Sequence, residues 1–175
     1  MRHGLAAALI GIALMTSPSG ARAQPEGQAC SAGPATLPPE LAGWSSRRPI
    51  MAAGEAAGLR AATLAIGSAA DATLKSTANV RYVTRPEKPG GSVSYGGLYS
   101  FTVDRAGTYR VALGSGAWID VLKGKTAITS TARGHGPDCS GVRKMVDFPL
   151  TPGRYTLQIA GNGEPSLPLM IARLP

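Results

Sequence analysis

The segment 133–144 holds the densest group of side chains that could do chemistry. His135, Asp138, Cys139 and Arg143 follow one another in a short glycine-rich stretch. Imidazole, carboxylate and thiolate are ligands for copper or zinc, so His135, Asp138 and Cys139 form a candidate metal or ligand loop. Their spacing matches no common metal motif. We therefore expect no cofactor, with copper or zinc as the alternative.

The two cysteines of the chain, Cys30 and Cys139, offer a simpler interpretation. In an oxidising compartment, two lone cysteines pair by default, and the bond would fasten the N-terminal part to the loop. A nucleophilic Cys139 activated by His135 would require a free thiol. The sequence therefore predicts a Cys30–Cys139 disulfide, and a free Cys139 would favour the metal alternative.

Other catalytic arrangements find little support. Without a leader of 23 residues, His135 is the only histidine, and neither a Gly-x-Ser-x-Gly elbow nor a phosphate-binding glycine loop is present. The carboxylates are scattered, and strand alternation places Asp120 on a solvent face, where Arg110 could pair with it. An enzyme is uncertain on these grounds, and we lean against one.

Aromatic side chains suggest a different use. Tyr82, Tyr95, Tyr99 and Trp118 could offer ring faces on which a sugar stacks. Tyr95 lies in the glycine-rich stretch 90–97 and is expected to be the exposed one, whereas alternation places Tyr99 in the core. Tyr95 is therefore the candidate aromatic contact.

The N-terminal segment has the pattern of a secretory signal peptide. A basic start at Arg2 precedes an apolar run over 5–15, and Ala21 and Ala23 form a small-x-small cleavage site. The run is shorter than the roughly 20 residues needed to span a bilayer. We expect cleavage after Ala23 and a periplasmic or secreted protein that does not span the membrane.

Net charge limits the choice of partner. The chain has 18 basic and 10 acidic residues, a formal charge of +8. The signal peptide contains two of the basic residues, which leaves +6 on the mature chain. The cations are scattered, without a long basic run or aromatic interleaving, so no nucleic-acid partner is expected. An unknown protein, a polysaccharide or an envelope component remains.

Two regions follow the signal peptide. Residues 24–60 form a Pro- and Ala-rich lead, with one helical turn expected at 38–42, a possible short helix at 51–60 and Trp44 as an anchor on the domain. Residues 61–175 have the period-2 alternation and Gly/Pro turns of an all-β domain. The predicted fold is an antiparallel, jelly-roll-like β-sandwich of about 8–10 short strands.

The expected strands can be placed along this region, with a hairpin or adjacent strands joined at the turn 150–153. They cover residues 61–66, 70–74, 80–84, 97–103, 108–113, 117–122, 125–129, 143–148, 154–160 and 167–172.

Two segments of the expected sandwich resemble a known family. Phe101-Thr-Val-Asp-Arg-Ala-Gly-Thr-Tyr-Arg-Val and Phe148-Pro-Leu-Thr-Pro-Gly-Arg-Tyr-Thr-Leu-Gln-Ile are similar to the strand starts of bacterial pre-peptidase C-terminal domains. The resemblance covers roughly 97–173. It implies a β-sandwich without catalytic residues, of the kind appended to secreted enzymes.

A second resemblance covers the mature chain. Gly116-Ala-Trp-Ile-Asp-Val and His135-Gly-Pro-Asp-Cys-Ser are similar to segments of small exported alphaproteobacterial proteins, some of which are labelled homogentisate 1,2-dioxygenase. The residues do not support that label, because such an iron site requires two histidines and a carboxylate.

Together these observations predict an exported, noncatalytic β-sandwich that binds a partner or serves as an accessory protein of the bacterial envelope. Two alternatives remain: a periplasmic protein that binds metal or a small ligand through the His135–Cys139 loop, and an enzyme of unknown reaction.

Overall fold

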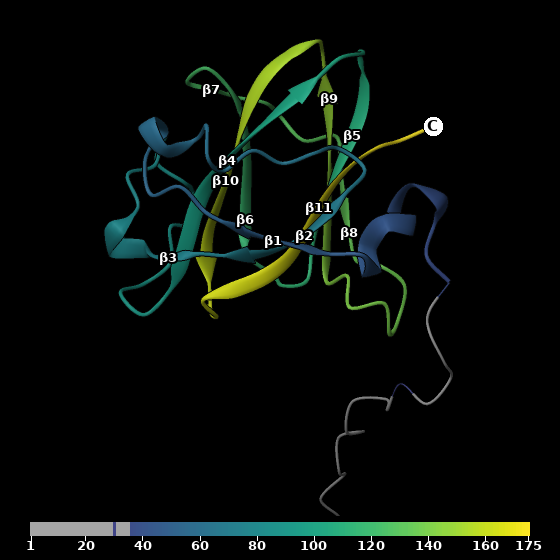
Figure 1. Cartoon of the computed structure of the whole chain (residues 1–175), viewed down its shortest axis with the longest axis horizontal. Helices are drawn as coiled ribbons and strands as arrows, with labels where there is room; N and C mark the ends of the chain where they lie inside the picture. Colours follow the sequence, from purple (N-terminus) through teal and green to yellow (C-terminus); the bar gives the residue numbers. More distant parts are fainter. Residues whose placement is uncertain (1–29, 31–35) are drawn as a thin grey trace, which may run out of the picture.

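The protein is a β-sandwich of two mainly antiparallel sheets (Figure 1). The computed structural model describes residue 30 and residues 36–175; the expected signal peptide lies outside them. Eleven strands are found in the described part: β1 (Arg48–Met51), β2 (Ala69–Thr73), β3 (Lys75–Ser76), β4 (Tyr95–Val103), β5 (Gly107–Leu113), β6 (Trp118–Lys123), β7 (Thr126–Ala127), β8 (Ala132–Gly134), β9 (Lys144–Leu150), β10 (Gly153–Asn162) and β11 (Ser166–Arg173).

The strand order separates the two sheets cleanly. One sheet has six strands in the order β1-β2-β11-β5-β9-β8, and the other has five in the order β3-β4-β10-β6-β7. Only the β1–β2 pair is parallel among these strand pairs. The last strand, β11, lies between β2 and β5 in the interior of its sheet. Short strands (β7 and β8) end one side of each sheet.

Alternation along the strands builds the core between the sheets. Phe101 of β4 stands opposite Tyr155 of β10, and their rings stack with centroids 5.5 Å apart. Tyr99 pairs in the same way with Leu157, and all four side chains are buried. Aromatic and aliphatic pairs facing each other across antiparallel strands are a main source of sheet stability. The sandwich expected from the sequence is confirmed.

Two expected strands are wrong. Residues 61–66 form turns, with only an isolated bridge from Thr63 to Ser100, and residues 80–84 form no strand. The backbone N–H of Val83 donates instead to Oε1 of the fully buried Gln158, at 2.7 Å. A side chain of β10 thus provides the hydrogen bond that a neighbouring strand would otherwise supply, which local sequence patterns do not reveal.

The turn at 150–153 joins strands of different sheets. The segments on either side are strands, as expected, but β9 belongs to the six-stranded sheet and β10 to the five-stranded one. Of the two expected arrangements the hairpin is wrong, and the turn joins consecutive strands of the sandwich. Thr151 and Tyr155 are linked here, because the backbone N–H of Thr151 donates to the Tyr155 hydroxyl and that hydroxyl donates to the Thr151 carbonyl. The chain crosses from sheet to sheet at this point.

The lead packs closely against the sandwich. Its short 3-10 helix η1 (Pro39–Ser45) includes the turn expected at 38–42, whereas the Ala-rich stretch 51–60 forms only the one-turn η2 (Ala56–Gly58). A third, η3 (Thr77–Asn79), follows β3. Strand β1 pairs with β2, so sheet pairing begins before residue 61.

A second, smaller core lies between η1 and the outer face of the six-stranded sheet. Leu41 and Trp44 of η1 are buried against Ala112 of β5, Val142 and Met170 of β11. In Figure 1, η1 lies beside this sheet, away from β4 and β10. The expectation that Trp44 anchors the lead is confirmed.

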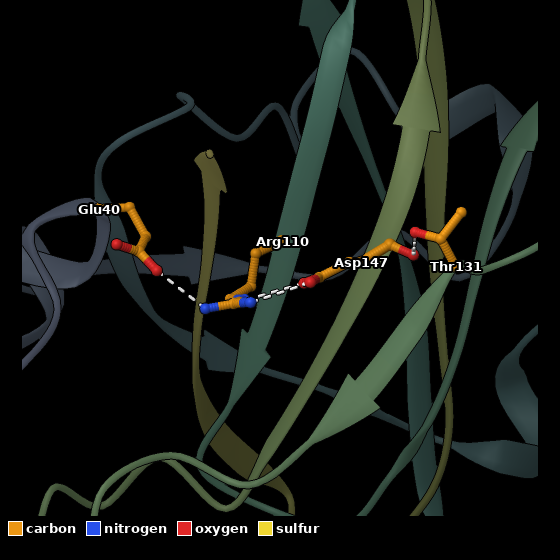
Figure 2. A network of polar contacts seen from close by, with 4 residues as sticks. All are labelled: Glu40, Arg110, Thr131 and Asp147. Carbon is orange, nitrogen blue, oxygen red and sulfur yellow. Dashed lines mark hydrogen bonds and ion pairs between the residues drawn. The ribbon is translucent and has the colours of Figure 1, made fainter. Parts of the chain in front are cut away.

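An ion-pair network closes this smaller core (Figure 2). Arg110 of β5 donates two hydrogen bonds to Asp147 of β9, at 2.8 and 2.9 Å, and a third to Glu40 of η1 at 2.8 Å. The bidentate geometry with Asp147 raises the pKa of Arg110. One guanidinium therefore fixes both the strand pair and the helix above it.

Candidate functional site

The loop between β8 and β9 carries the residues that the sequence singled out. Cys139 is disulfide-bonded to Cys30, with a Cα–Cα distance of 5.5 Å, so the predicted bond is confirmed. Cys139 has φ 60°, a left-handed conformation uncommon for a residue with a side chain. It occupies a turn in which the Ser140 N–H donates to the Pro137 carbonyl. The loop therefore holds the lead on the domain.

This disulfide removes the thiolate from the proposed metal loop. His135 is exposed, and its Nδ1 lies 2.7 Å from the carbonyl oxygen of Arg143, to which it donates as Nδ1–H. Asp138 is exposed at the turn. Within the described residues, no group of three His, Cys, Asp or Glu side chains is arranged to hold a metal ion. Of the expected metal ligands, only Nε2 of His135 and the separate carboxylate of Asp138 are left.

The two ends of the 133–144 segment lead to a different feature. They form the antiparallel pair β8–β9, in which Arg133 stands opposite Val146. Arg133 and Lys144 line a cleft of about 540 Å³. Its other walls come from β6 with the preceding Gly116, from β9 and β10, from residues 128–130 after β7 and from the segment 87–90. The cleft thus lies where the short-stranded sides of the two sheets meet.

Trp118 forms the central aromatic surface of this cleft. It begins β6, and Asp120, two residues later, lies on the same face of the strand. The indole Nε1–H donates to Asp120 Oδ1 at 2.9 Å, and Gln158 Nε2 donates to Asp120 Oδ2 at 3.4 Å. Burial raises the pKa of Asp120, and these two hydrogen bonds oppose the rise. The carboxylate fixes the edge of the indole ring.

Asp120 therefore differs from the expected partnership with Arg110. The two residues are in different sheets, and Arg110 pairs with Asp147 and Glu40 instead. Strand alternation identified the face of Asp120 but could not tell which sheet would contain its neighbour.

Two ammonium groups lie near the same indole ring. Lys88 Nζ is 5.6 Å and Lys144 Nζ is 5.7 Å from the centroid of the Trp118 ring, within the range of cation–π attraction. Lys144 also donates to the carbonyl of Ala117 at 2.7 Å. Burial lowers the pKa of Lys144, and the charges of Lys88 and Arg133 lower it further. The cleft gathers cations that repel one another.

Close backbone packing brings Lys88 to this place. Gly90 has φ +84°, and a Cβ added there would collide with the Cα of Gly161 in β10 and with the side chain of Ser94. Glycine alone lets the 87–90 segment approach β10 so closely. The sequence drew attention to the glycines around Tyr95 but not to this consequence for Lys88.

The remaining tyrosines are largely structural. Tyr95 is half-buried and packs against the main core rather than standing exposed, and it is not among the cleft residues. Tyr82 is partly buried and donates its hydroxyl hydrogen to the Ile159 carbonyl at 3.2 Å. Tyr99 is fully buried, as expected. Of the four aromatic residues that the sequence singled out, Trp118 is the one that lines the cleft, where Phe148 is a second aromatic residue.

Comparison with known proteins gives a fold-level likeness. The chain is similar to the crystal structure of a pre-peptidase C-terminal domain of a collagenase from Bacillus anthracis. The two share 13% identity with a TM-score of 0.37, over 71% of this chain and 95% of that domain. No family model and no curated protein matches. In the described part of the chain, no helix is long and apolar enough to cross a membrane.

Proposed function

We propose that this protein is an exported, noncatalytic binding module of the bacterial envelope, which holds its ligand in the Trp118 cleft. The cleft carries the proposal: it combines an aromatic ring, three cations and a volume within the roughly 300–1,000 Å³ typical of ligand sites. The lining combines apolar side chains with charged and hydroxyl groups, which can orient a ligand.

The disulfide supports export. Cys30–Cys139 links the two parts of the chain, and such bonds persist in the periplasm or outside the cell rather than in the cytosol. The signal peptide expected at residues 1–23 is the matching sequence feature. Export is tested by cell fractionation: the chain should be found in the periplasm or the medium, beginning at Gln24 and without free thiols. Cytosolic protein retaining its first 23 residues would contradict it.

The groups around the cleft favour binding over catalysis. Lys144 donates to a backbone carbonyl, and Asp120 accepts from Trp118 and Gln158, so neither is poised beside a nucleophile. The sole histidine of the mature chain, His135, is bonded to the Arg143 carbonyl. This arrangement supports the proposed accessory role.

Binding is tested by sedimentation of the purified chain with a cell-envelope fraction of walls and outer membranes. The protein should sediment with the envelopes, and Trp118→Ala should stay in the supernatant. Arg60→Ala is the matched control, because Arg60 is exposed and is not among the cleft residues. Equal sedimentation of wild type and Trp118→Ala would overturn the role of the cleft.

A further inference from the structure

The side chains around Trp118 differ in kind from those of a simple anion site. Lys88, Lys144 and Arg133 supply three positive charges, and within the described residues none of them forms an ion pair. Two carboxylates, Glu87 and Asp120, line the same cleft. A bound anion would relieve the repulsion among the cations, whereas the carboxylates would repel a second negative charge beside it.

This mixture fits a sugar acid. Carboxylates accept hydrogen bonds from hydroxyl groups, and the hydroxyls of Thr129 and Ser130 in the cleft wall can donate or accept. The indole of Trp118 offers an apolar surface to the C–H side of a sugar ring, beside the ammonium groups of Lys88 and Lys144. A sugar acid brings one anionic group together with several hydroxyls, and so satisfies both kinds of protein group at once.

Small residues allow a flat ring to come close. Gly116, Gly161 and Ala160 line the cleft beside Trp118, so little side chain stands between a ligand and the backbone there. The cleft is partly open to solvent, so a polymer segment can lie in it while the rest of the polymer continues outside.

We propose that the Trp118 cleft binds an acidic polysaccharide through the carboxylate of a uronic-acid unit, with Arg133, Lys144 and Lys88 as its charge partners. This inference rests on the proposed function and names the ligand class of that site. A polyphosphate or nucleic acid is disfavoured, because its closely spaced charges would meet Glu87 and Asp120. A neutral glycan leaves the three cations without a partner.

The experiment is a calorimetric titration of the purified chain with three polymers. Polygalacturonate is the polyuronate, dextran is the neutral polysaccharide and polyphosphate is the polyanion without sugar hydroxyls. We expect polygalacturonate to bind at least tenfold more tightly than either of the others. Its affinity should fall as salt rises from 50 to 300 mM, because part of the attraction is between charges.

Variants connect the binding to the cleft. Trp118→Ala and Arg133→Ala should each weaken polygalacturonate binding about tenfold or more, and Arg60→Ala, which removes the same charge as Arg133→Ala elsewhere, should leave it unchanged. Arg133 is exposed, so its truncation tests the cleft even if Trp118→Ala unfolds. Equal loss in Arg133→Ala and Arg60→Ala would reveal nonspecific charge attraction and overturn the inference.

The polymers also separate this inference from the function on which it rests. Dextran or polyphosphate binding as tightly as polygalacturonate overturns the uronate assignment. Absence of polygalacturonate binding does so too. In either case, envelope sedimentation that still depends on Trp118 leaves the proposed binding function standing; loss of that dependence removes both.

Discussion

The two tryptophans of this protein both donate their indole N–H to a nearby oxygen, but they lie in different surroundings. Trp44 is 3% exposed and donates its indole N–H to the Ser140 carbonyl at 3.1 Å. Trp118 donates to the Asp120 carboxylate at 2.9 Å, but its ring lines a cleft. Each region also contains an arginine. Arg110, which binds Glu40 of η1, is held between two carboxylates, whereas Arg133 in the cleft lining is exposed.

This difference separates the region around Trp44, which stabilises the fold, from the region around Trp118, which we propose to bind the ligand. Around Trp44, cations and carboxylates are paired and a disulfide covers the loop, so the group acts as a clamp on the lead. Around Trp118, three cations lie close together, with Lys88 and Arg133 exposed and Lys144 half-buried. Cations without an ion pair contribute little to folding but can attract an anionic group of a ligand.

The largest expected effect distinguishes the two rings directly. Trp44→Ala should lower the free energy of unfolding by about 3–5 kcal/mol, because it empties a closed apolar site. Trp118→Ala should cost only about 1 kcal/mol, since a partly exposed ring buries less apolar area. Urea unfolding measures the free energy of unfolding of both variants. Equal losses would mean that the two rings contribute alike to stability.

The Arg110 network should rank next. Arg110→Ala leaves Glu40 and Asp147 as uncompensated, largely buried carboxylates, which should cost about 3 kcal/mol. Arg133→Ala is the comparison, with an expected change within about 0.5 kcal/mol at an exposed position. Urea unfolding measures the stability of both variants. A small effect of Arg110→Ala would show that the ion pairs do not hold η1.

Loss of the disulfide should have an effect of similar size on stability and none on binding. The free energy of unfolding of the Cys30→Ser/Cys139→Ser double variant should be about 2–4 kcal/mol lower than that of wild type. The reason is that the bond links residues 109 apart and restricts the unfolded chain. Envelope sedimentation at a temperature where the variant is folded should match wild type. A parallel loss of sedimentation would show that the clamp and the cleft are coupled.

The smallest expected effect concerns the pH dependence of stability near Trp118. Burial raises the pKa of Asp120 above its unfolded value, so folding favours the protonated carboxyl. That contribution is present below the unfolded pKa of about 3.9 and is lost as pH rises through the folded pKa.

Asp120→Asn removes this titration. Relative to wild type, the variant should gain stability on the order of a few tenths of a kcal/mol between pH 3 and pH 7, since water screens the half-exposed group. Urea midpoints at the two pH values test it; a relative loss of stability at pH 7 would mean that the charged carboxylate is needed to hold Trp118.

The fold was predictable because alternation is local. The strands around Tyr99, Tyr109 and Tyr155 follow from side chains two residues apart, and these rings are buried as expected. The expected strand at 80–84 fails because Gln158, far along the chain, bonds the backbone there through its side chain. The expected hairpin fails because a Pro-Gly turn also suits a crossing between sheets.

Only some residues of the candidate site could be predicted from the sequence. The 133–144 segment stood out by composition, and Trp118 was considered as an aromatic surface. Which side chains meet depends on sheet order, and this order brings the start of β6 together with Arg133 and Lys144. The disulfide was accessible from the sequence because two cysteines leave one intramolecular pairing.

The position of β11 has a consequence for synthesis. A ribosome releases residues 166–173 after all the other strands, yet this segment bridges β2 and β5, and the β1–β2 pair is joined to the rest of its sheet through it. Long-range pairing of this kind slows folding. The six-stranded sheet therefore cannot be completed until residues 166–173 have been synthesised, and the early β1–β2 pair waits for β11 while the intervening strands are made.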